Sequence, residues 1–301
     1  MSRVLVIRLG ALGDFVQSFG PFAAIRAAYA GAEITLLTTV PFAGLALLCP
    51  WFDRVEMDAR PAWWNLPGLL RLRRQLAGFD MVFDLQTSGR STRYFQLAGR
   101  PAWSGIALGC SHPQTGPERE QMHTWERQRD QLRIAGIAEV ADPDLGFLTG
   151  RPVAGLPARF AMLVPGAAVH RPGKRWPVGR FGELAVLMAA RGLVPVVVGA
   201  EADAPLAAAI RAVCPAALDF TGRTAIPDIF ALAARAEMAV GNDTGPMHIA
   251  AATGTPCTVL FSAESNPAMT APRGPGGVWS AVLRAPVLAD LPVERVAASL
   301  W

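Results

Sequence analysis

The part of the chain best suited to chemistry is the polar segment Gly241–His248, which follows a short apolar run. Pro246 stands where a helix would begin. Free N–H groups at a helix start bind anions, and the Thr244 hydroxyl adds a donor. Asp243 cannot bind a phosphate itself, but it could orient the loop or accept a hydrogen bond from a sugar hydroxyl. His248 falls one turn into the helix, on the side facing the loop. The segment predicts an anion site; an unliganded helix start and a structural histidine are the alternatives.

A second candidate is the loop Pro165–Pro177, which carries Lys174, the only lysine of the chain, beside Arg175. The loop is rich in glycine and proline, follows a predicted strand and leads into a predicted helix. Lysine offers a compact point charge and arginine a planar fork, so both suit phosphate binding. A solvated basic loop without a ligand is the alternative.

The third candidate is the turn Arg8–Asp14 between the first predicted strand and the first helix. Gly10 and Gly13 allow a tight turn and close approach to a ligand. The Gly-x-Gly-x-x-Gly pattern of dinucleotide-binding proteins is absent. Asp14 at the start of a helix is either a capping residue or a catalytic base, and the helix dipole favours its ionised form in both cases.

Weaker candidates follow two other predicted strands. Glu201 comes after Gly199-Ala200 and is either a ligand for ribose hydroxyls or a helix-start acid. Gln86, Ser88 and Arg90 follow the fourth strand and are expected to face the ligand site, because ligands of open α/β sheets bind beyond the carboxyl ends of the strands.

Arginines gather before and within the helix predicted over 66–76. Arg60 precedes it, and Arg71, Arg73 and Arg74 lie on it. They form either a solvated face or a contact with an anionic acceptor or a lipid surface.

The elements that position these loops alternate between strands and helices, and the strands are apolar on both faces, which predicts parallel sheets covered on both sides. Strands are predicted at 4–7, 33–37, 54–57, 81–85, 160–164, 194–198, 238–240 and 257–261, and helices at 14–29, 66–76, 123–135, 178–191, 202–213, 226–235, 246–252 and 292–300. A Pro/Gly-rich stretch at 142–157 is the best boundary. We therefore predict two doubly wound domains, 1–155 and 156–301, with the site in a cleft between them.

Composition restricts the function classes. The 301 residues are 51% hydrophobic and 17% charged, which favours two well-packed cores over disorder. A net charge of +4 suits an anionic substrate or membrane surface, and no basic run with interleaved aromatics indicates nucleic acid. Four scattered cysteines predict neither zinc nor disulfides and fit a cytoplasmic protein. The N-terminus does not read as a signal peptide, and proline and glycine interrupt both long apolar stretches, 34–52 and 244–263.

Together these residues resemble glycosyltransferase family 9, the heptosyltransferases, which transfer heptose from ADP-heptose onto the inner core of lipopolysaccharide. Val4–Asp14 resembles the opening strand and Gly-Asp turn of the family, and Phe83–Gln86 its Asp-Leu-Gln segment. Lys174–Pro177 is similar to its Lys-x-Trp-Pro element. Gly241–Ala252 carries its most specific signature, Asn-Asp-[Ser/Thr]-Gly-x-x-His-x-Ala-Ala.

The resemblance implies a GT-B fold, two Rossmann-like domains facing a central cleft, with the acceptor site in 1–155 and the donor site in 156–301. The C-terminal helix can pack back on the first domain. The resemblance further implies inversion at the sugar carbon, an ADP-sugar donor, and no cofactor or obligatory metal. The acceptor would be a lipid-linked anionic glycan, which would bring the protein to the cytoplasmic face of the inner membrane.

The resemblance also assigns roles to residues. Asp14 would be the base, and Lys174 would contact phosphate and assist catalysis. Glu201 would bind ribose. The remaining donor contacts would come from the two glycine-flanked turns, and they are Gly13, Asp243, Thr244, Gly245 and His248. The acceptor would be met by Gln86, Arg90 and Arg60.

Three alternatives stay open. One is a non-catalytic nucleotide-sugar-binding protein of the same fold, which would have little need for Asp14. Another is a family member that uses a different sugar donor. The third, a sugar-nucleotide epimerase or NAD enzyme, is disfavoured because both Gly-x-Gly-x-x-Gly and Tyr-x-x-x-Lys are missing.

Overall fold

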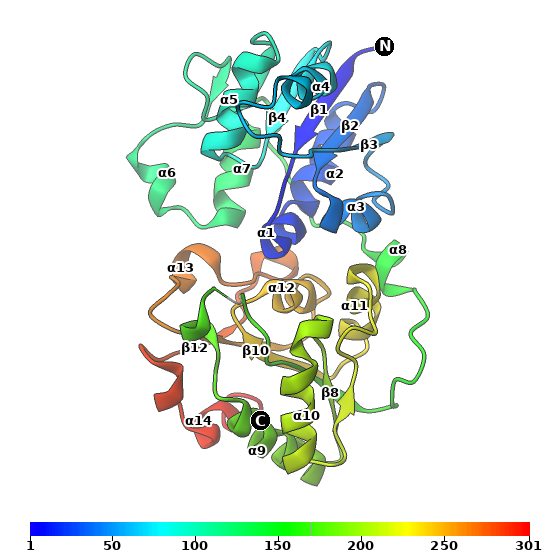
Figure 1. Ribbon diagram of the computed structural model, residues 1–301, viewed down its shortest axis with the longest axis vertical. Coiled ribbons are helices and arrows are strands. Elements are labelled where there is room, and N and C mark those ends of the chain that lie inside the picture. Colours follow the sequence, from blue (N-terminus) through cyan, green and yellow to red (C-terminus); the bar gives the residue numbers. More distant parts are fainter. Residues whose placement is uncertain (169) are drawn as a thin grey trace. The chain divides into compact units, whose positions relative to one another are not determined.

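The computed structural model describes residues 1–168 and 170–301, and its contacts divide the chain into two units, Met1–Pro143 and Asp144–Trp301. Figure 1 shows the helices and strands of each. Val169, which belongs to the predicted phosphate loop, lies outside the described residues. Within the described residues, no helix is long and apolar enough to cross a bilayer.

The first unit is built on a parallel sheet in the order β3-β2-β1-β4-β5-β6. The strands are β1 (Arg3–Ile7), β2 (Glu33–Thr38), β3 (Arg54–Met57), β4 (Met81–Asp84), β5 (Ala102–Gly105) and β6 (His112–Pro113). The helices are α1 (Leu12–Gln17), α2 (Phe19–Ala28), α3 (Val40–Ala46), α4 (Leu66–Leu76), α5 (Gly89–Leu97), α6 (Pro117–Gln121) and α7 (Thr124–Ile134). β1 pairs with both β2 and β4, so the strand order reverses beside β1. This is the strand order of a doubly wound nucleotide-binding sheet.

The second unit repeats this plan with the order β12-β11-β10-β7-β8-β9. Its strands are β7 (Phe160–Val164), β8 (Val194–Val197), β9 (Leu218–Asp219), β10 (Met238–Asn242), β11 (Cys257–Phe261) and β12 (Ala281–Arg284). Its α-helices are α8 (Gly146–Thr149), α9 (Val178–Ala190), α10 (Ala204–Val213), α11 (Ile226–Ala233), α12 (Gly245–Ala252), α13 (Pro267–Thr270) and α14 (Val293–Ala297). Short 3₁₀ turns are η1 (Pro172–Lys174), η2 (Glu201–Asp203), η3 (Pro275–Gly277) and η4 (Leu288–Asp290). The order reverses between β7 and β10.

Each sheet is buried on both sides, as predicted for doubly wound domains. The residues of β4 and β7 are all buried, and the core of the second unit joins β7, β8, β10 and β11 to α9, α10 and α14. Burial of apolar surface contributes about 25 cal/mol per Å² to the folding free energy, and it is the main stabilising contribution to such layered domains.

Three predictions about the elements need correction. The helix predicted over 14–29 is two helices that meet at Ser18, because Pro21 has no N–H to donate to the Gln17 carbonyl and its ring disfavours a continuous helix there. The predicted loop 109–120 contains β6 and most of α6. The boundary falls after Pro143 rather than after 155, since α8 packs on α11 and Arg151 pairs with Asp228 at 3.2 Å. The C-terminal helix α14 packs on α9 of its own unit, through its buried valines.

Candidate functional site

In the second unit, both predicted phosphate-binding loops leave the sheet where the strand order reverses. The loop 165–177 follows β7, and the segment 243–248 follows β10, its neighbour in the sheet. Two loops that diverge from adjacent parallel strands leave a crevice between them, and this is where such sheets bind ligands. The topology thus brings together two loops that are about 70 residues apart in the sequence.

Asn242 fixes these loops to each other. Its side chain is fully buried, its Oδ1 accepts from the Trp176 N–H at 3.0 Å, and its Nδ2 donates to the Pro165 carbonyl at 2.8 Å. The buried Trp176 ring in turn donates from Nε1 to the Leu291 carbonyl at 2.9 Å. The amide therefore satisfies backbone groups at both ends of the 165–177 loop, which is a structural role.

Lys174 and Asp243 form the central contact of this crevice. Lys174 Nζ lies 2.5 Å from Asp243 Oδ2, and the side chains are 13% and 7% exposed. A pair so removed from water needs its partner, because leaving one charge unpaired there is costly. The ammonium has three donors, and one bond to Asp243 leaves two for a ligand. Of the two roles considered for Asp243, the structure favours orienting the loop.

Helix α12 begins beside this pair. Its N-cap is Thr244 in an extended conformation, and the Thr244 side chain makes no cap hydrogen bond. Thr244 and Gly245 are half-buried, while His248 is buried in the second turn. The close fit extends under the loop: a Cβ on Gly241 would lie 2.6 Å from Val164 Cβ. Pro246 has no N–H and the Met247 N–H donates to the Thr244 carbonyl at 3.1 Å, so the donors offered to an anion here are the Gly245 N–H and the Thr244 hydroxyl.

Glu201 begins η2 immediately after β8, the strand next to β7, and its side chain is exposed. Gly222 lies against it: the Gly222 N–H donates to the Gly199 carbonyl at 3.0 Å, and a Cβ on Gly222 would lie 3.1 Å from Glu201 Cα. The exposed carboxylate stands at the carboxyl edge of the sheet, as a ribose ligand would. Sequence reasoning missed the 220–224 turn, whose only sequence signal was Gly222; the positive φ of this glycine shows why the turn needs it.

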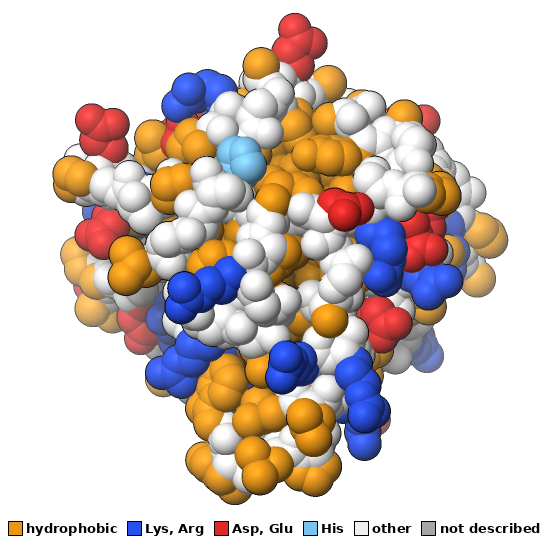
Figure 2. All heavy atoms as spheres, turned by 90° about the horizontal axis from the view of Figure 1, so that it is seen from above, with side chains coloured by type: hydrophobic (Ala, Val, Ile, Leu, Met, Phe, Trp, Pro, Cys, Tyr) orange, Lys and Arg blue, Asp and Glu red, His pale blue; other side chains and the backbone are white. Residues whose placement is uncertain are grey.

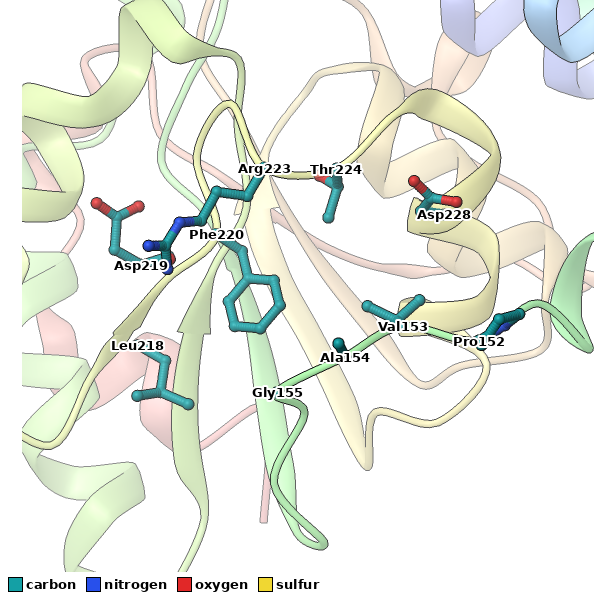
Figure 3. A pocket seen from close by; sticks show the side chains of 10 residues that line it. All are labelled: Pro152, Val153, Ala154, Gly155, Leu218, Asp219, Phe220, Arg223, Thr224 and Asp228. Carbon is teal, nitrogen blue, oxygen red and sulfur yellow. The ribbon is translucent and has the colours of Figure 1, made fainter.

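A pocket of about 490 Å³ in this unit opens beyond the 220–224 turn. Figure 3 shows the Phe220 ring in its middle, with Asp219 and Arg223 on one side and Thr224 and Asp228 on the other. None of the predicted donor residues lines it. The donor site argued above therefore rests on the loop geometry and not on this pocket.

In the first unit, Asp14 lies where the loop after β1 enters α1. The N-cap of α1 is Ala11, and Asp14 is in the first turn without being the cap, so the capping alternative is wrong. The Asp14 side chain is 41% exposed, and its Oδ2 lies 3.5 Å from Nη2 of Arg8, which is 4% exposed. Gly13, predicted to bind the donor, is buried beside it.

Arg8 is buried next to this turn and links it to the end of β4. Its Nη1 donates to the Leu85 carbonyl, and burial lowers the pKa of its guanidinium, while Asp14 and Asp84 oppose that shift. Asp84 ends β4 and is fully buried; burial raises its pKa to about 6, although the Thr87 N–H donates to its Oδ1 at 3.0 Å. Arg8 thus places a buried guanidinium beside a carboxylate that still faces solvent.

The three predicted acceptor residues lie near this turn. Gln86 Oε1 accepts from the Leu9 N–H at 2.8 Å, and Arg60 Nη2 donates to the Leu9 carbonyl at 2.8 Å. Both therefore hold the backbone ahead of Asp14. Arg90 Nη1 donates to the Pro61 carbonyl at 3.3 Å, on the α5 side.

A small polar pocket of about 130 Å³ joins two of these predicted residues, Asp14 and Gln86. It is also lined by residues that sequence reasoning missed, among them Thr124 and Arg127 of α7. Their only signal was a polar helix with little apolar periodicity. By contrast Ser88, expected at the site, caps α5 by accepting from the Ser91 N–H at 3.2 Å.

Comparison with known proteins gives the family and the fold. Residues 69–282 match the model of glycosyltransferase family 9 (heptosyltransferase). Lipopolysaccharide core heptosyltransferase OpsX of Haemophilus influenzae is 23% identical over 295 residues, covering 89% of this chain and 80% of that protein. Lipooligosaccharide heptosyltransferase 2 of the same organism is 33% identical over 106 residues, which is 34% of this chain and 30% of that protein.

Among solved structures, E. coli heptosyltransferase WaaC with ADP-2-deoxy-2-fluoro heptose superposes with a TM-score of 0.78 at 20% identity, over 98% of each chain. The predicted GT-B fold of two doubly wound α/β units is thereby confirmed. The family match covers well over half of the chain and includes the Lys174 loop and the start of α12. The chain therefore belongs to glycosyltransferase family 9, and the predicted enzyme class, a glycosyltransferase, is confirmed with it.

Proposed function

We propose that this glycosyltransferase moves a sugar, heptose in the first instance, from an ADP-sugar onto the core of lipopolysaccharide or a related glycan, with inversion at the sugar carbon. The observation that carries the proposal is the buried Lys174–Asp243 pair at the open N-terminus of α12. It places a cation with free donors beside the Gly245 N–H and the positive end of the helix dipole, which suits a diphosphate.

In this mechanism the departing ADP is the main electrostatic problem. Negative charge builds on the diphosphate as the bond to the sugar breaks. Lys174, the Thr244 hydroxyl and the Gly245 N–H at the start of α12 would stabilise that charge, and groups already fixed in place are the most effective. These donors supply the neutralisation, so the proposal includes no obligatory metal. Glu201 would accept hydrogen bonds from the ribose hydroxyls.

Asp14 would act as the base on the acceptor hydroxyl. Inversion needs one carboxylate on the face opposite the leaving group, and the hydroxyl proton passes to it as the new bond to the anomeric carbon forms. Arg8 holds the carboxylate at 3.5 Å without burying it. Gln86 and Arg60 keep the turn rigid through Leu9, so their effect on the acceptor would be largely positional.

The nature of both substrates is inferred from the relatives. WaaC was solved with an ADP-heptose analogue, and OpsX is named for the lipopolysaccharide core. An acceptor of that kind is anionic and lipid-linked, so we place the protein in the cytoplasm at the inner membrane face. The basic side chains of the first unit suit such an acceptor.

The test measures transfer of radiolabelled sugar from ADP-heptose, ADP-glucose and UDP-glucose to lipopolysaccharide core of defined truncation. We expect ADP-heptose to be preferred and the product to have the inverted anomeric configuration. Asp14→Asn should abolish most transfer, whereas Glu139→Gln, an exposed acid of the same unit, should not. Binding of ADP-heptose without transfer to any core would establish the non-catalytic alternative, and preference for ADP-glucose would establish a different donor.

A further inference from the structure

A group of large apolar side chains in the first unit is exposed at the start of α4. Trp64, Leu66 and Leu70 are 85%, 69% and 56% exposed. Residues four apart share one face of a helix, so Leu66 and Leu70 lie in line. Leu72 and Leu76, on the opposite side, are buried in the core and fix which face points outward. Soluble proteins rarely leave such a group uncovered without a partner.

The same outer face becomes basic toward the C-terminal end of α4. Arg73 and Arg74 lie in its last turn and continue the line of Leu66 and Leu70. From Ala59 to Phe79 the sequence contains four arginines and no acidic residue. In Figure 2, hydrophobic and basic side chains lie side by side along the lower edge of the face shown. We call Trp64, Leu66, Leu70, Arg73 and Arg74 the α4 surface.

The segment that displays Trp64 is held in place. Its neighbour Trp63 is half-buried between Arg90 and Arg93, whose guanidinium carbons lie 5.2 and 5.1 Å from its ring centroid. Asn65 caps α4 by accepting from the Gly68 N–H at 3.1 Å, and its own N–H donates to the Ala62 carbonyl at 2.9 Å. Two adjacent tryptophans thus have opposite environments, and the outward one needs no rearrangement to meet a partner.

We propose that the α4 surface docks on an anionic lipid bilayer, with Trp64, Leu66 and Leu70 entering the headgroup boundary and Arg73 and Arg74 binding lipid phosphates. The positive charge of the α4 surface favours an anionic bilayer over a second copy of the chain. In a dimer through this surface arginines would face arginines, whereas anionic headgroups attract them. Tryptophan favours the bilayer interface, and arginine reaches phosphate from an apolar stem. This inference goes beyond the proposed transfer reaction and does not depend on it.

The experiment measures partitioning of the full-length protein onto vesicles by sedimentation. Vesicles of phosphatidylcholine alone are compared with vesicles containing one third phosphatidylglycerol. We expect binding to the anionic vesicles only. Each arginine near such a surface contributes about 1 kcal/mol, so Arg73→Gln/Arg74→Gln should lower the partition coefficient about 30-fold. Trp64→Ser/Leu70→Ser should lower it at least tenfold, and salt should weaken the binding of the unmodified protein.

Matched controls separate this surface from general charge and hydrophobicity. Arg211→Gln/Arg235→Gln removes the same charge from exposed positions of the second unit, and Leu108→Ser removes another exposed leucine. Both should partition as the unmodified protein does. An equal loss in the controls, equal binding to neutral vesicles, or no binding would overturn the proposal, as would a dimer that Trp64→Ser dissociates. Thermal stabilisation by ADP should persist in all α4 variants, so a failed transfer reaction would be recognised separately.

Discussion

The Lys174–Asp243 pair leads to an asymmetric prediction for two single variants. In Lys174→Met the cation that would meet the diphosphate is gone. In Asp243→Asn the cation remains, but a neutral amide replaces its carboxylate partner, and one negative charge is removed from the proposed diphosphate site. We therefore expect Lys174→Met to weaken ADP binding and Asp243→Asn to preserve or strengthen it.

The geometry sets the magnitudes. Unit charges 2.5 Å apart attract by roughly 6–7 kcal/mol at an effective dielectric constant of about 20, and desolvation offsets most of this. Removing one partner of such a buried pair costs about 3 kcal/mol of unfolding free energy in either variant. A charge-assisted bond from Lys174 to phosphate contributes about 1.5–3 kcal/mol, so Lys174→Met should raise the Kd for ADP by roughly 10- to 150-fold.

Calorimetric titration with ADP and chemical unfolding with and without ADP provide the assay. ADP should restore more stability to Asp243→Asn than to the unmodified protein, because the diphosphate replaces the missing counter-charge. Arg159→Met and Glu237→Gln are the control, since that ion pair is exposed and should contribute less than about 1 kcal/mol. An unchanged Kd in Lys174→Met, or equal weakening of ADP binding in both variants, would refute the assignment of Lys174 to the phosphates.

Three further predictions address the rest of the site. Asp14→Ala should lower turnover by about 10²- to 10⁴-fold and leave ADP-sugar affinity intact in calorimetry; an equal loss of affinity would remove Asp14 from the role of base. Burial raises the pKa of Asp84 to about 6 from 3.8, so stability should fall by about 3 kcal/mol as pH rises from about 4 to 6, and Asp84→Asn should flatten that slope in urea unfolding. Transfer assays should keep their rate in excess EDTA, and recovery of a lost rate by Mg²⁺ would contradict a metal-independent reaction.

The layer architecture could be predicted from sequence because its signals are local. Short apolar runs such as Phe160–Val164 and Cys257–Phe261 are typical of strands buried on both faces, and the structure places them in the sheet with the same bounds. The strands β5 and β12 were missed. Each is only four residues long. The sequences Ala-Trp-Ser-Gly and Ala-Val-Leu-Arg are too short to show the alternating pattern of a strand.

Breaks within elements and boundaries between units were predicted less well because they depend on single contacts. The pattern of Phe15, Phe19 and Phe22 fits one continuous helix, yet the single residue Pro21, which has no N–H to donate, divides it. The Pro/Gly-rich stretch marks where a boundary is permitted, but the ion pair between Arg151 and Asp228 decides to which unit the stretch belongs. Such pairings connect residues far apart in the chain and leave no local periodicity.

The motif Gly241–His248 illustrates how one short sequence serves two different needs. Gly241 lacks a Cβ because Val164 occupies that space, and Asn242 spends both of its polar atoms on the neighbouring loop. Neither has a group left for a ligand. Asp243 has both a structural and a chemical role, because its carboxylate holds the Lys174 ammonium at 2.5 Å beside the start of α12. Substitutions at Gly241 and Asn242 should therefore damage stability and ADP binding together, whereas those at Asp243 should separate the two.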